Sequence, residues 1–487
     1  MTQIVETIIA DTMTELLARR DRDTPADLVE LRMDGVVDLD VAGALSGRRR
    51  PVIATCRAAW EGGRFAGGEH ERLAVLEQAA KLGADFVDVE WKADRDALDR
   101  CRAHTRVIVS NHDFDGVPAD LSARVRAMHG VGADTVKVAV TARSLADCVT
   151  LGRAFEGVSG PHVAIAMGSA GLVTRLWPAW LGSRWTYGGR AAPGQMSTEA
   201  LAVRYRVRET TRTTQVYAVT GSPLGHSASP AMHNAAFAAL GIDAVYLPLE
   251  TANPADLFTL ADALPLAGAS VTIPLKRDLL RASGVTVDVD ELPRRIGALN
   301  TLRRTETGWE GRNFDVAGFL APLERRAIPL RGSRALVLGA GGAARAAVHG
   351  LHAAGAEVTI AARRHAAATE LAAEFGVGAT NWPAAADWDL LVNTTPVGMS
   401  PHAGASPLDD DSLRSAAGKV VYDMVYNPPD TRLLTQAAAA GAETIGGLEM
   451  LVAQACRQFE WWTGRTAPRD VMSDAASAFL REATARI

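Results

Sequence analysis

Eight short apolar runs of β-type residues mark the first 213 residues, and most are separated by segments whose apolar residues recur at helical spacing. The runs are QIVETIIA, ADLVELRMD, PVIATCR, DFVDVEW, RVIVSNHDF, TVKVAV, HVAIAM and SRWTYGG. Alternating strands and helices predict a parallel α/β sheet, and eight strands are the number that closes a (β/α)8 barrel. A doubly wound open sheet would give a similar pattern, so it stays as the alternative to a barrel over residues 1–213.

Charged residues stand at the ends of these runs, where a buried strand tolerates them poorly. They are Glu30, Arg32, Arg57, Asp88, Glu90 and His112, with Lys137 inside the sixth run. An unpaired charge is costly to bury, but the carboxyl ends of barrel strands converge on one pocket. Any one of these residues could belong to a buried ion pair; together they predict an active site.

Lys137 is one of only five lysines among 51 basic residues, and its neighbours are valines. Lysine, unlike arginine, can lose its proton and form an imine with a ketone. The apolar flanks predict a pKa lowered by about three units, which would free a large fraction of the amine near neutral pH. His112, whose ordinary pKa is near neutral, is the predicted proton carrier.

A second α/β pattern follows the polar linker RETTRTTQ, so residues 214–487 are predicted to form a separate enzyme half. Its first strand leads to Ser227 and to Ser229-Pro230, which predict a helix with Ser229 as N-cap and the proline at the first helical position. Two hydroxyls beside a helix N-terminus could hold a carboxylate. The alternative is that Ser229 only caps its helix.

Four polar residues from separate strand ends and loops predict a substrate pocket in this half. They are Thr272, Lys276, Asn300 and Asp315. Lys276 is expected to end the strand GASVTIPLK, and the alternative is that it is a solvated surface charge.

A dinucleotide site is predicted from the apolar strand, glycine turn and helix of SRALVLGAGGAARAAVHGL. Gly339, Gly341 and Ala344 fit the pattern G-x-G-x-x-A, whose backbone donors face a pyrophosphate. The next strand ends in Ala362 and is followed by Arg363 and Arg364 rather than by an acid. Arginines there favour the 2′-phosphate of NADP over the free ribose of NAD.

The first half resembles type I 3-dehydroquinate dehydratase over nearly all its length, in the motifs ELRMD, CRxxxEGG, DVE, SNHDF, VKV, TRL and APGQ. The resemblance implies that Lys137 forms a Schiff base with the C3 carbonyl of 3-dehydroquinate. It also implies that His112, oriented by Glu90, moves the protons of the elimination. The implied substrate-binding residues are Glu30, Arg32, Arg57, Arg175, which would take the carboxylate, and Gln195. Ala191 stands where that family usually has serine.

The second half resembles shikimate dehydrogenase, in the motifs SxSP, VTIPxK, ALNT, NxD, GAGGA, NTTPxGM, YDMxY and GLxMLVxQ. The resemblance implies that Lys276 and Asp315 protonate the C3 oxygen as NADPH delivers hydride. The implied substrate-binding residues are Ser227, Ser229, Thr272, Asn300, Tyr426 and Gln454, the serines holding the carboxylate. The implied cofactor-binding residues are Gly339, Gly341, Gly342, Ala343, Arg363, Arg364, Thr394, Met424 and Gly447. Ser270, Phe314 and Ala362 depart from the usual pattern, although Ser270 looks like the two-domain plant-type enzymes.

The composition of the chain argues against several classes of binding partner. A net charge of −5 argues against nucleic acid and against a membrane surface. The four cysteines lie far apart without a CxxC pair, which indicates neither a metal site nor a disulfide framework. The chain shows no targeting segment and no apolar span of transmembrane length. These features predict a cytoplasmic protein without a metal.

The two resemblances support each other, because the product of the first reaction is the substrate of the second. We therefore expect a bifunctional shikimate-pathway enzyme that acts on 3-dehydroquinate, 3-dehydroshikimate and shikimate. The expected division is a barrel over 1–213, a substrate subdomain from 214–320 plus the C-terminal helix, and an NADP-binding Rossmann-type subdomain over 321–450. The alternatives are a second half that prefers quinate, or a metabolite-sensing regulatory protein on the same folds. The oligomeric state stays open.

Overall fold

The computed structural model describes residues 2–189, 195–225, 227–281, 287–382 and 387–484. The chain divides into two compact units, Met1–Val216 with Asp243–Pro265, and Tyr217–Ile242 with Leu266–Ile487.

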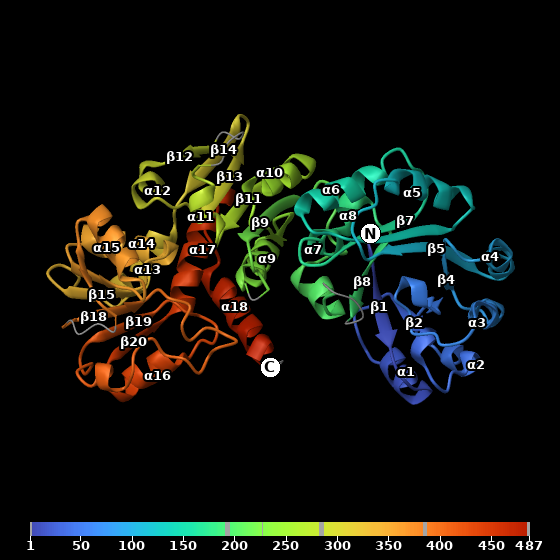
Figure 1. Cartoon of the computed structure of the whole chain (residues 1–487), viewed down its shortest axis with the longest axis horizontal. Helices are drawn as coiled ribbons and strands as arrows, with labels where there is room; N and C mark the ends of the chain where they lie inside the picture. Colours follow the sequence, from blue (N-terminus) through green and yellow to red (C-terminus); the bar gives the residue numbers. More distant parts are fainter. Residues whose placement is uncertain (1, 190–194, 226, 282–286, 383–386, 485–487) are drawn as a thin grey trace. The chain divides into compact units, whose positions relative to one another are not determined.

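Eight strands form a parallel sheet in the order β7-β6-β5-β4-β3-β2-β1-β8 (Figure 1). At the seam between the outer two, the Arg184 amide donates to the His162 carbonyl at 2.8 Å, so the sheet is a near-closed barrel. This confirms the barrel prediction over the open sheet. The strands are β1 (Gln3–Ile9), β2 (Leu28–Arg32), β3 (Val52–Thr55), β4 (Phe86–Glu90), β5 (Arg106–Asp113), β6 (Thr135–Thr141), β7 (His162–Met167) and β8 (Trp185–Gly189).

Helices follow most of the barrel strands. Ser144 shows how a local sequence starts one: its side chain accepts from the Asp147 amide, and the Asp147 carboxylate accepts from the Ser144 amide in return. The helices are α1 (Met13–Arg20), α2 (Val41–Leu45), α3 (Glu69–Lys81), α4 (Arg95–Arg102), α5 (Leu121–Gly130), α6 (Leu145–Ala154), α7 (Leu172–Leu176) and α8 (Pro178–Leu181). Short helical turns lie at η1 (Met33–Gly35), η2 (Ala59–Glu61) and η3 (Ala200–Arg204).

The barrel interior changes from apolar to polar along the strands. One buried cluster fills it at the start of the strands, and its members include Val5, Leu28, Ile53, Phe86, Ile108 and Trp185. Side chains two residues apart share a face of a strand, so the next inward positions are Thr7, Glu30, Thr55, Asp88 and Ser110. The apolar layer closes the barrel, and the polar layer above it becomes the floor of a site.

A second, mixed sheet has the order β10-β9-β11-β13-β14-β12. Its strands are β9 (Gln215–Gly221), β10 (Ala244–Glu250), β11 (Leu266–Val271), β12 (Val287–Val289), β13 (Thr301–Thr305) and β14 (Gly308–Arg312). The helices that accompany them in sequence are α9 (Ser229–Ala239), α10 (Pro254–Ala263), α11 (Leu275–Asp278) and α12 (Glu291–Ile296). The sequence returns to this subdomain through α17 (Gly447–Thr463) and α18 (Arg469–Thr484).

The third sheet is parallel, in the order β17-β16-β15-β18-β19-β20. In chain order this is 3-2-1-4-5-6, the Rossmann arrangement, whose ligand crevice lies where the order reverses, here between β15 and β18. The strands are β15 (Arg334–Leu338), β16 (Glu357–Ala361), β17 (Gly378–Thr380), β18 (Leu390–Asn393), β19 (Val420–Asp423) and β20 (Glu443–Gly446). The helices are α13 (Asp315–Arg325), α14 (Gly342–Ala353), α15 (His365–Phe375) and α16 (Arg432–Ala439), and a short turn η4 (Asp411–Leu413) precedes β19.

Two local predictions in this half are wrong. Helix α9 begins at Ser229, and Ala228 is the N-cap, so the serine lies inside the first turn. The Ser227 hydroxyl instead accepts from the Ser229 amide at 3.3 Å, because it is the side chain that precedes the turn. Lys276 does not end a strand: β11 stops at Val271, and Lys276 lies in the short helix α11 after Pro274.

Candidate active sites

A cavity of about 150 Å³ opens at the carboxyl ends of the barrel strands. Its lining contains most of the residues that the sequence predicts for the first site: Glu30, Arg32, Arg57, His112, Lys137, Arg175 and Gln195. Ala191 lies outside the described residues. Strand ends far apart in the sequence thus meet in one pocket.

Lys137 lies in the pocket floor with its ammonium between two acids. Its Nζ is 3.0 Å from Asp88 Oδ2 and 3.2 Å from Glu30 Oε1. Burial by itself would lower the pKa of Lys137, but the carboxylates of Asp88 and Glu30 raise it above its ordinary value. The prediction of a lowered pKa is therefore wrong, because the neighbouring strands supply two carboxylates that the valines of β6 do not reveal.

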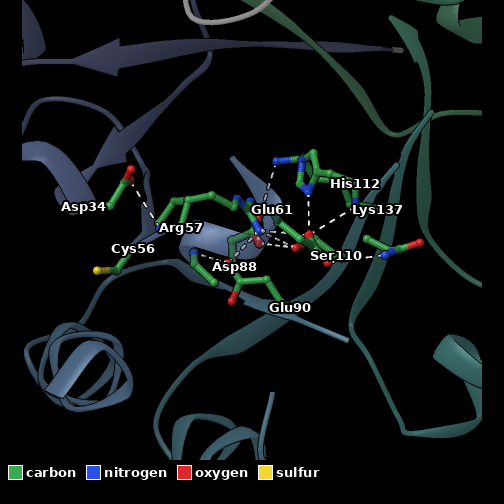
Figure 2. Close-up of polar contacts among 12 residues, drawn as sticks. Asp34, Cys56, Arg57, Glu61, Asp88, Glu90, Ser110, His112 and Lys137 are labelled. Atoms are coloured by element: carbon green, nitrogen blue, oxygen red, sulfur yellow. Dashed lines mark hydrogen bonds and ion pairs between the residues drawn. The ribbon is translucent and has the colours of Figure 1, made fainter. Parts of the chain in front are cut away.

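Arg57 is the cation that holds this floor together (Figure 2). It is 2.9 Å from Asp88 Oδ1 and 2.9 Å from Glu90 Oε1, and it donates to Ser110 Oγ at 2.8 Å. Arg72 contacts the other oxygen of Glu90 at 2.7 Å. Glu90, expected to orient His112, is instead occupied by two arginines, because its position at the end of β4 faces Arg57.

Glu61 is the residue that orients His112, and the sequence prediction missed it. Its Oε2 lies 2.8 Å from His112 Nδ1 and accepts from the His112 amide at 3.1 Å (Figure 2). Burial raises the pKa of the Glu61 carboxyl to about 7 and lowers the pKa of the His112 imidazole well below its ordinary value. The sequence feature that could have identified Glu61 is its place directly before the two glycines of the EGG motif.

Arg175 is the cation suited to an incoming anion. Its side chain is buried, and among the described residues no acid pairs with it. Burial without a counter-charge lowers the pKa of Arg175 to about 10. Arg32, by contrast, is held by Asp34 through two hydrogen bonds of 2.8 and 2.9 Å. A carboxylate entering the pocket would therefore be attracted most to Arg175.

The second unit brings four predicted residues together. Lys276 Nζ donates to Asp315 Oδ2 at 2.5 Å, and Asn300 Nδ2 donates to Asp315 Oδ1 at 2.8 Å. Gln454 approaches from α17, with its Oε1 3.5 Å from Asn300 Nδ2. A Cβ on Gly318 would lie 2.6 Å from the Cβ of Gln454, so this glycine allows the close approach of α13 and α17.

The remaining predicted substrate residues lie on other loops of the same unit. The amide of Thr272 donates to the Thr220 carbonyl at the end of β9, so Thr272 lies beside the strand that leads to the serine loop. Ser227 is half-buried and Ser229 is buried. Tyr426 follows β19, and burial raises the pKa of its hydroxyl.

The glycine loop lies at the switch point of the Rossmann sheet. Gly339 follows β15 at φ +114°, and a Cβ there would lie 2.5 Å from Thr394 Oγ1 after β18. Gly341 caps α14, so the amides of Gly342 and Ala343 begin its first turn. This is a backbone cradle for a pyrophosphate at a helix N-terminus. A Cβ on Gly342 would lie 3.6 Å from Lys276 Cδ, so the cradle adjoins the lysine.

Two further elements complete this site. Gly447 opens α17, and a Cβ there would lie 2.3 Å from the Met424 carbonyl, which only glycine allows. Arg363 and Arg364 follow β16 and are exposed. The residues fit a dinucleotide with an additional phosphate.

Comparisons with known proteins agree with both sites. The family model of type I 3-dehydroquinase matches residues 5–212, and those of the shikimate dehydrogenase substrate-binding and C-terminal domains match 219–302 and 447–476. A bifunctional 3-dehydroquinate dehydratase/shikimate dehydrogenase of Arabidopsis thaliana, named as chloroplastic, is 33% identical over 95% of this chain and 82% of its own. The chain belongs to this bifunctional family.

The dehydrogenase half of this bifunctional enzyme has further relatives. The NADP(+) shikimate dehydrogenase of Methanosarcina acetivorans is 40% identical, over 53% of this chain and 96% of its own. The shikimate 5-dehydrogenase of Thermus thermophilus, solved with NADP(H) and shikimate, is 38% identical with a TM-score of 0.50, over 54% of this chain and 99% of its own. Within the described residues, no helix has both the length and the apolar character to cross a membrane.

Proposed function

We propose that the barrel dehydrates 3-dehydroquinate to 3-dehydroshikimate through an imine on Lys137, and that the second half reduces this product to shikimate with NADPH. The observation that carries the proposal is the meeting of Lys137, His112 and Arg175 around one cavity. A metabolite sensor would need neither Lys137 and His112 nor the Lys276–Asp315 pair.

In the barrel, Arg175 takes the substrate carboxylate, with Arg32 and Gln195 beside the pocket. The Lys137 ammonium, held by Asp88 and Glu30, first loses a proton to solvent, and the free amine then attacks the C3 carbonyl. Water leaves to give the imine, which acidifies the adjacent C2. His112 takes a proton from C2 and returns it to the C1 hydroxyl, which departs as water. Hydrolysis of the imine then restores Lys137 and releases 3-dehydroshikimate.

The dehydratase rate is expected to rise as the pH passes upward through about 7. Glu61, whose pKa is raised to about 7, must be ionised to accept the proton on His112 Nδ1, and only then is Nε2 free to act as a base. Glu61→Gln should lower kcat about 100-fold, because a neutral amide does not stabilise the imidazolium that forms when His112 takes the proton. The pH–rate profile measures both. An unchanged rising limb in Glu61→Gln would contradict the assignment.

In the second half, the Lys276 ammonium protonates the C3 oxygen of 3-dehydroshikimate, and Asp315 holds that ammonium in place. Ser227 and Ser229 are proposed to hold the carboxylate, and Thr272, Asn300, Tyr426 and Gln454 the ring hydroxyls. NADPH, when bound, supplies the hydride. Gly339, Gly341, Gly342 and Ala343 would hold its pyrophosphate, Thr394, Met424 and Gly447 would border the rest, and Arg363 and Arg364 would take the 2′-phosphate.

The two arginines provide a test of cofactor choice. The double variant Arg363→Ser/Arg364→Ser is expected to raise the KM for NADPH by about tenfold or more, since charge-assisted bonds to a phosphate are lost. The KM for NADH should stay within about twofold, because NADH has no 2′-phosphate. Arg414→Ser, at an exposed arginine of the same subdomain, is the matched control. Equal increases for both cofactors would contradict the assignment.

The whole proposal is tested by supplying 3-dehydroquinate and NADPH to the intact chain. NADPH oxidation is expected, because the first half supplies the second. Borohydride added during turnover should reduce the imine and leave the mass of the ligand on Lys137, located by peptide mass spectrometry. A ligand mass on another side chain, or on none, would contradict the mechanism.

We also propose that the enzyme works in the cytoplasm, because all four cysteines are free and buried, as a reducing compartment favours. The proposed division stays at residue 213, just before β9 begins at Gln215. The proposed partners are the three small-molecule substrates and the cofactor, and the net charge of −5 disfavours nucleic acid and membranes.

A further inference from the structure

A series of buried hydrogen bonds lies behind the Lys276–Asp315 pair. It starts at Ser270 on β11, passes through Gln458 on α17, and reaches Asn300 and Thr301 at the start of β13. Gln458 is 1% exposed and lies one helical turn beyond Gln454. Polar side chains this deeply buried must be satisfied in a fixed arrangement.

Each hydrogen bond in the series fixes the direction of the next. Ser270 Oγ donates to Gln458 Oε1 at 2.7 Å, so the amide nitrogen of Gln458 must face the other way. That Nε2 donates to Thr301 Oγ1 at 2.8 Å and to the Asn300 carbonyl at 3.3 Å. The Thr301 hydroxyl, having accepted, donates to Asn300 Oδ1 at 2.8 Å. The same Oδ1 also accepts from the Phe314 amide at 2.8 Å.

The outcome is a fixed orientation of the Asn300 amide. With Oδ1 occupied by two donors, Nδ2 faces Asp315 Oδ1, to which it donates at 2.8 Å. The other carboxylate oxygen, Oδ2, is thereby turned to Lys276 Nζ. A flipped amide would place two oxygens, Asn300 Oδ1 and Asp315 Oδ1, against each other and displace the carboxylate.

We propose that Gln458 is a positioning residue of the dehydrogenase reaction: through Thr301 and Asn300 it fixes the oxygen of Asp315 that holds the Lys276 ammonium. The inference rests on the proposed roles of Lys276 and Asp315. Gln458 does not touch the substrate in this scheme, so it acts mainly on the rate of proton delivery and only indirectly, through Asn300, on substrate binding. It also gives Ser270 a function, because its hydroxyl sets the orientation of the Gln458 amide.

Two variants of Gln458 separate the direction of the bonds from packing. Gln458→Met keeps the length of the side chain and removes its hydrogen bonds, and kcat for shikimate oxidation should fall about tenfold. Gln458→Glu keeps the shape but accepts from Thr301, which turns that hydroxyl away from Asn300; kcat should fall about 30-fold. The KM for shikimate should change less than kcat in both, since the substrate-binding role proposed for Asn300 is affected only through the orientation of its amide. Gln215→Glu, at the exposed start of β9, is the control for the added charge.

Thr301 provides the second measurement. Thr301→Val removes the hydroxyl and should lower kcat about as much as Gln458→Met, whereas Thr301→Ser keeps the hydroxyl and should restore most of it. Because both residues act through one series of bonds, the double variant Gln458→Met/Thr301→Val should be no slower than either single variant within about twofold. Dehydratase activity of the same molecules should be unchanged, and it reports whether the chain is intact.

Three results would each overturn the inference. They are a parental kcat in Gln458→Glu, a change confined to KM, and fully additive losses in the double variant. A parallel loss of dehydratase activity would also overturn it, since the effect would then be one of general folding. Lys276→Met separates this failure from that of the proposed function. If Lys276→Met is inactive while the Gln458 variants are normal, only the positioning role fails; if Lys276→Met is active, the proposed roles of Lys276 and Asp315 fail as well.

Discussion

Lys137→Met should lose dehydratase activity by about 10⁴-fold or more, since removal of the covalent nucleophile removes the imine that acidifies C2. The same molecules should still reduce added 3-dehydroshikimate with NADPH at a rate within about twofold of the parent, because the two sites lie in separate units and share no residue. Each activity is measured separately, one by formation of 3-dehydroshikimate and the other by NADPH oxidation.

The loss of the positive charge at residue 137 needs a separate control variant. Methionine leaves Asp88 and Glu30 without the ammonium between them, and breaking such a buried pair costs about 3–5 kcal/mol of stability. Lys137→Arg keeps a cation next to both carboxylates but cannot form an imine. It should be as inactive as Lys137→Met, with a smaller decrease in the free energy of unfolding. Dehydratase activity in Lys137→Arg would contradict covalent catalysis.

The opposite division of effects is expected at Lys276, with loss of the dehydrogenase activity and retention of the dehydratase activity. Lys276→Met should lower kcat of the dehydrogenase about 1,000-fold, because general-acid groups contribute about 10²–10⁴-fold. Dehydratase activity should be unchanged. Lys419→Met is the matched control, since Lys419 belongs to the same half and its ammonium, among the described residues, contacts only Asp387, at 3.2 Å, and the Trp388 ring. Retained reduction in Lys276→Met would show that another group protonates the oxygen.

Much of the fold could be predicted because strand periodicity is a local property. Alternation of two residues places Glu30, Asp88 and Lys137 on the inner face of their strands, and closure of the barrel then brings them together. The protonation of Lys137 could not be predicted in this way. It depends on Asp88 and Glu30, which are 49 and 107 residues away in the sequence and become neighbours only through the order of the strands.

The orienting residues were missed for the same reason. Glu61 reaches His112 from the short helical turn η2 after the third strand, and a turn of three residues is too short to show a periodicity. Gln458 shares the helical face of Gln454, but its partners Ser270 and Thr301 are more than 150 residues away along the chain. Charged and reactive residues at strand ends could be predicted from the sequence. The residues that hold them in place could not, because they are defined by tertiary contacts.

The buried position of Arg175 affects the stability of the barrel. A buried guanidinium that pairs with no acid among the described residues weakens the barrel, and a bound carboxylate removes that weakness. The free energy of unfolding of the barrel should thus be larger with a carboxylate bound than without one. We therefore expect a bound substrate to raise the midpoint temperature of unfolding of the barrel.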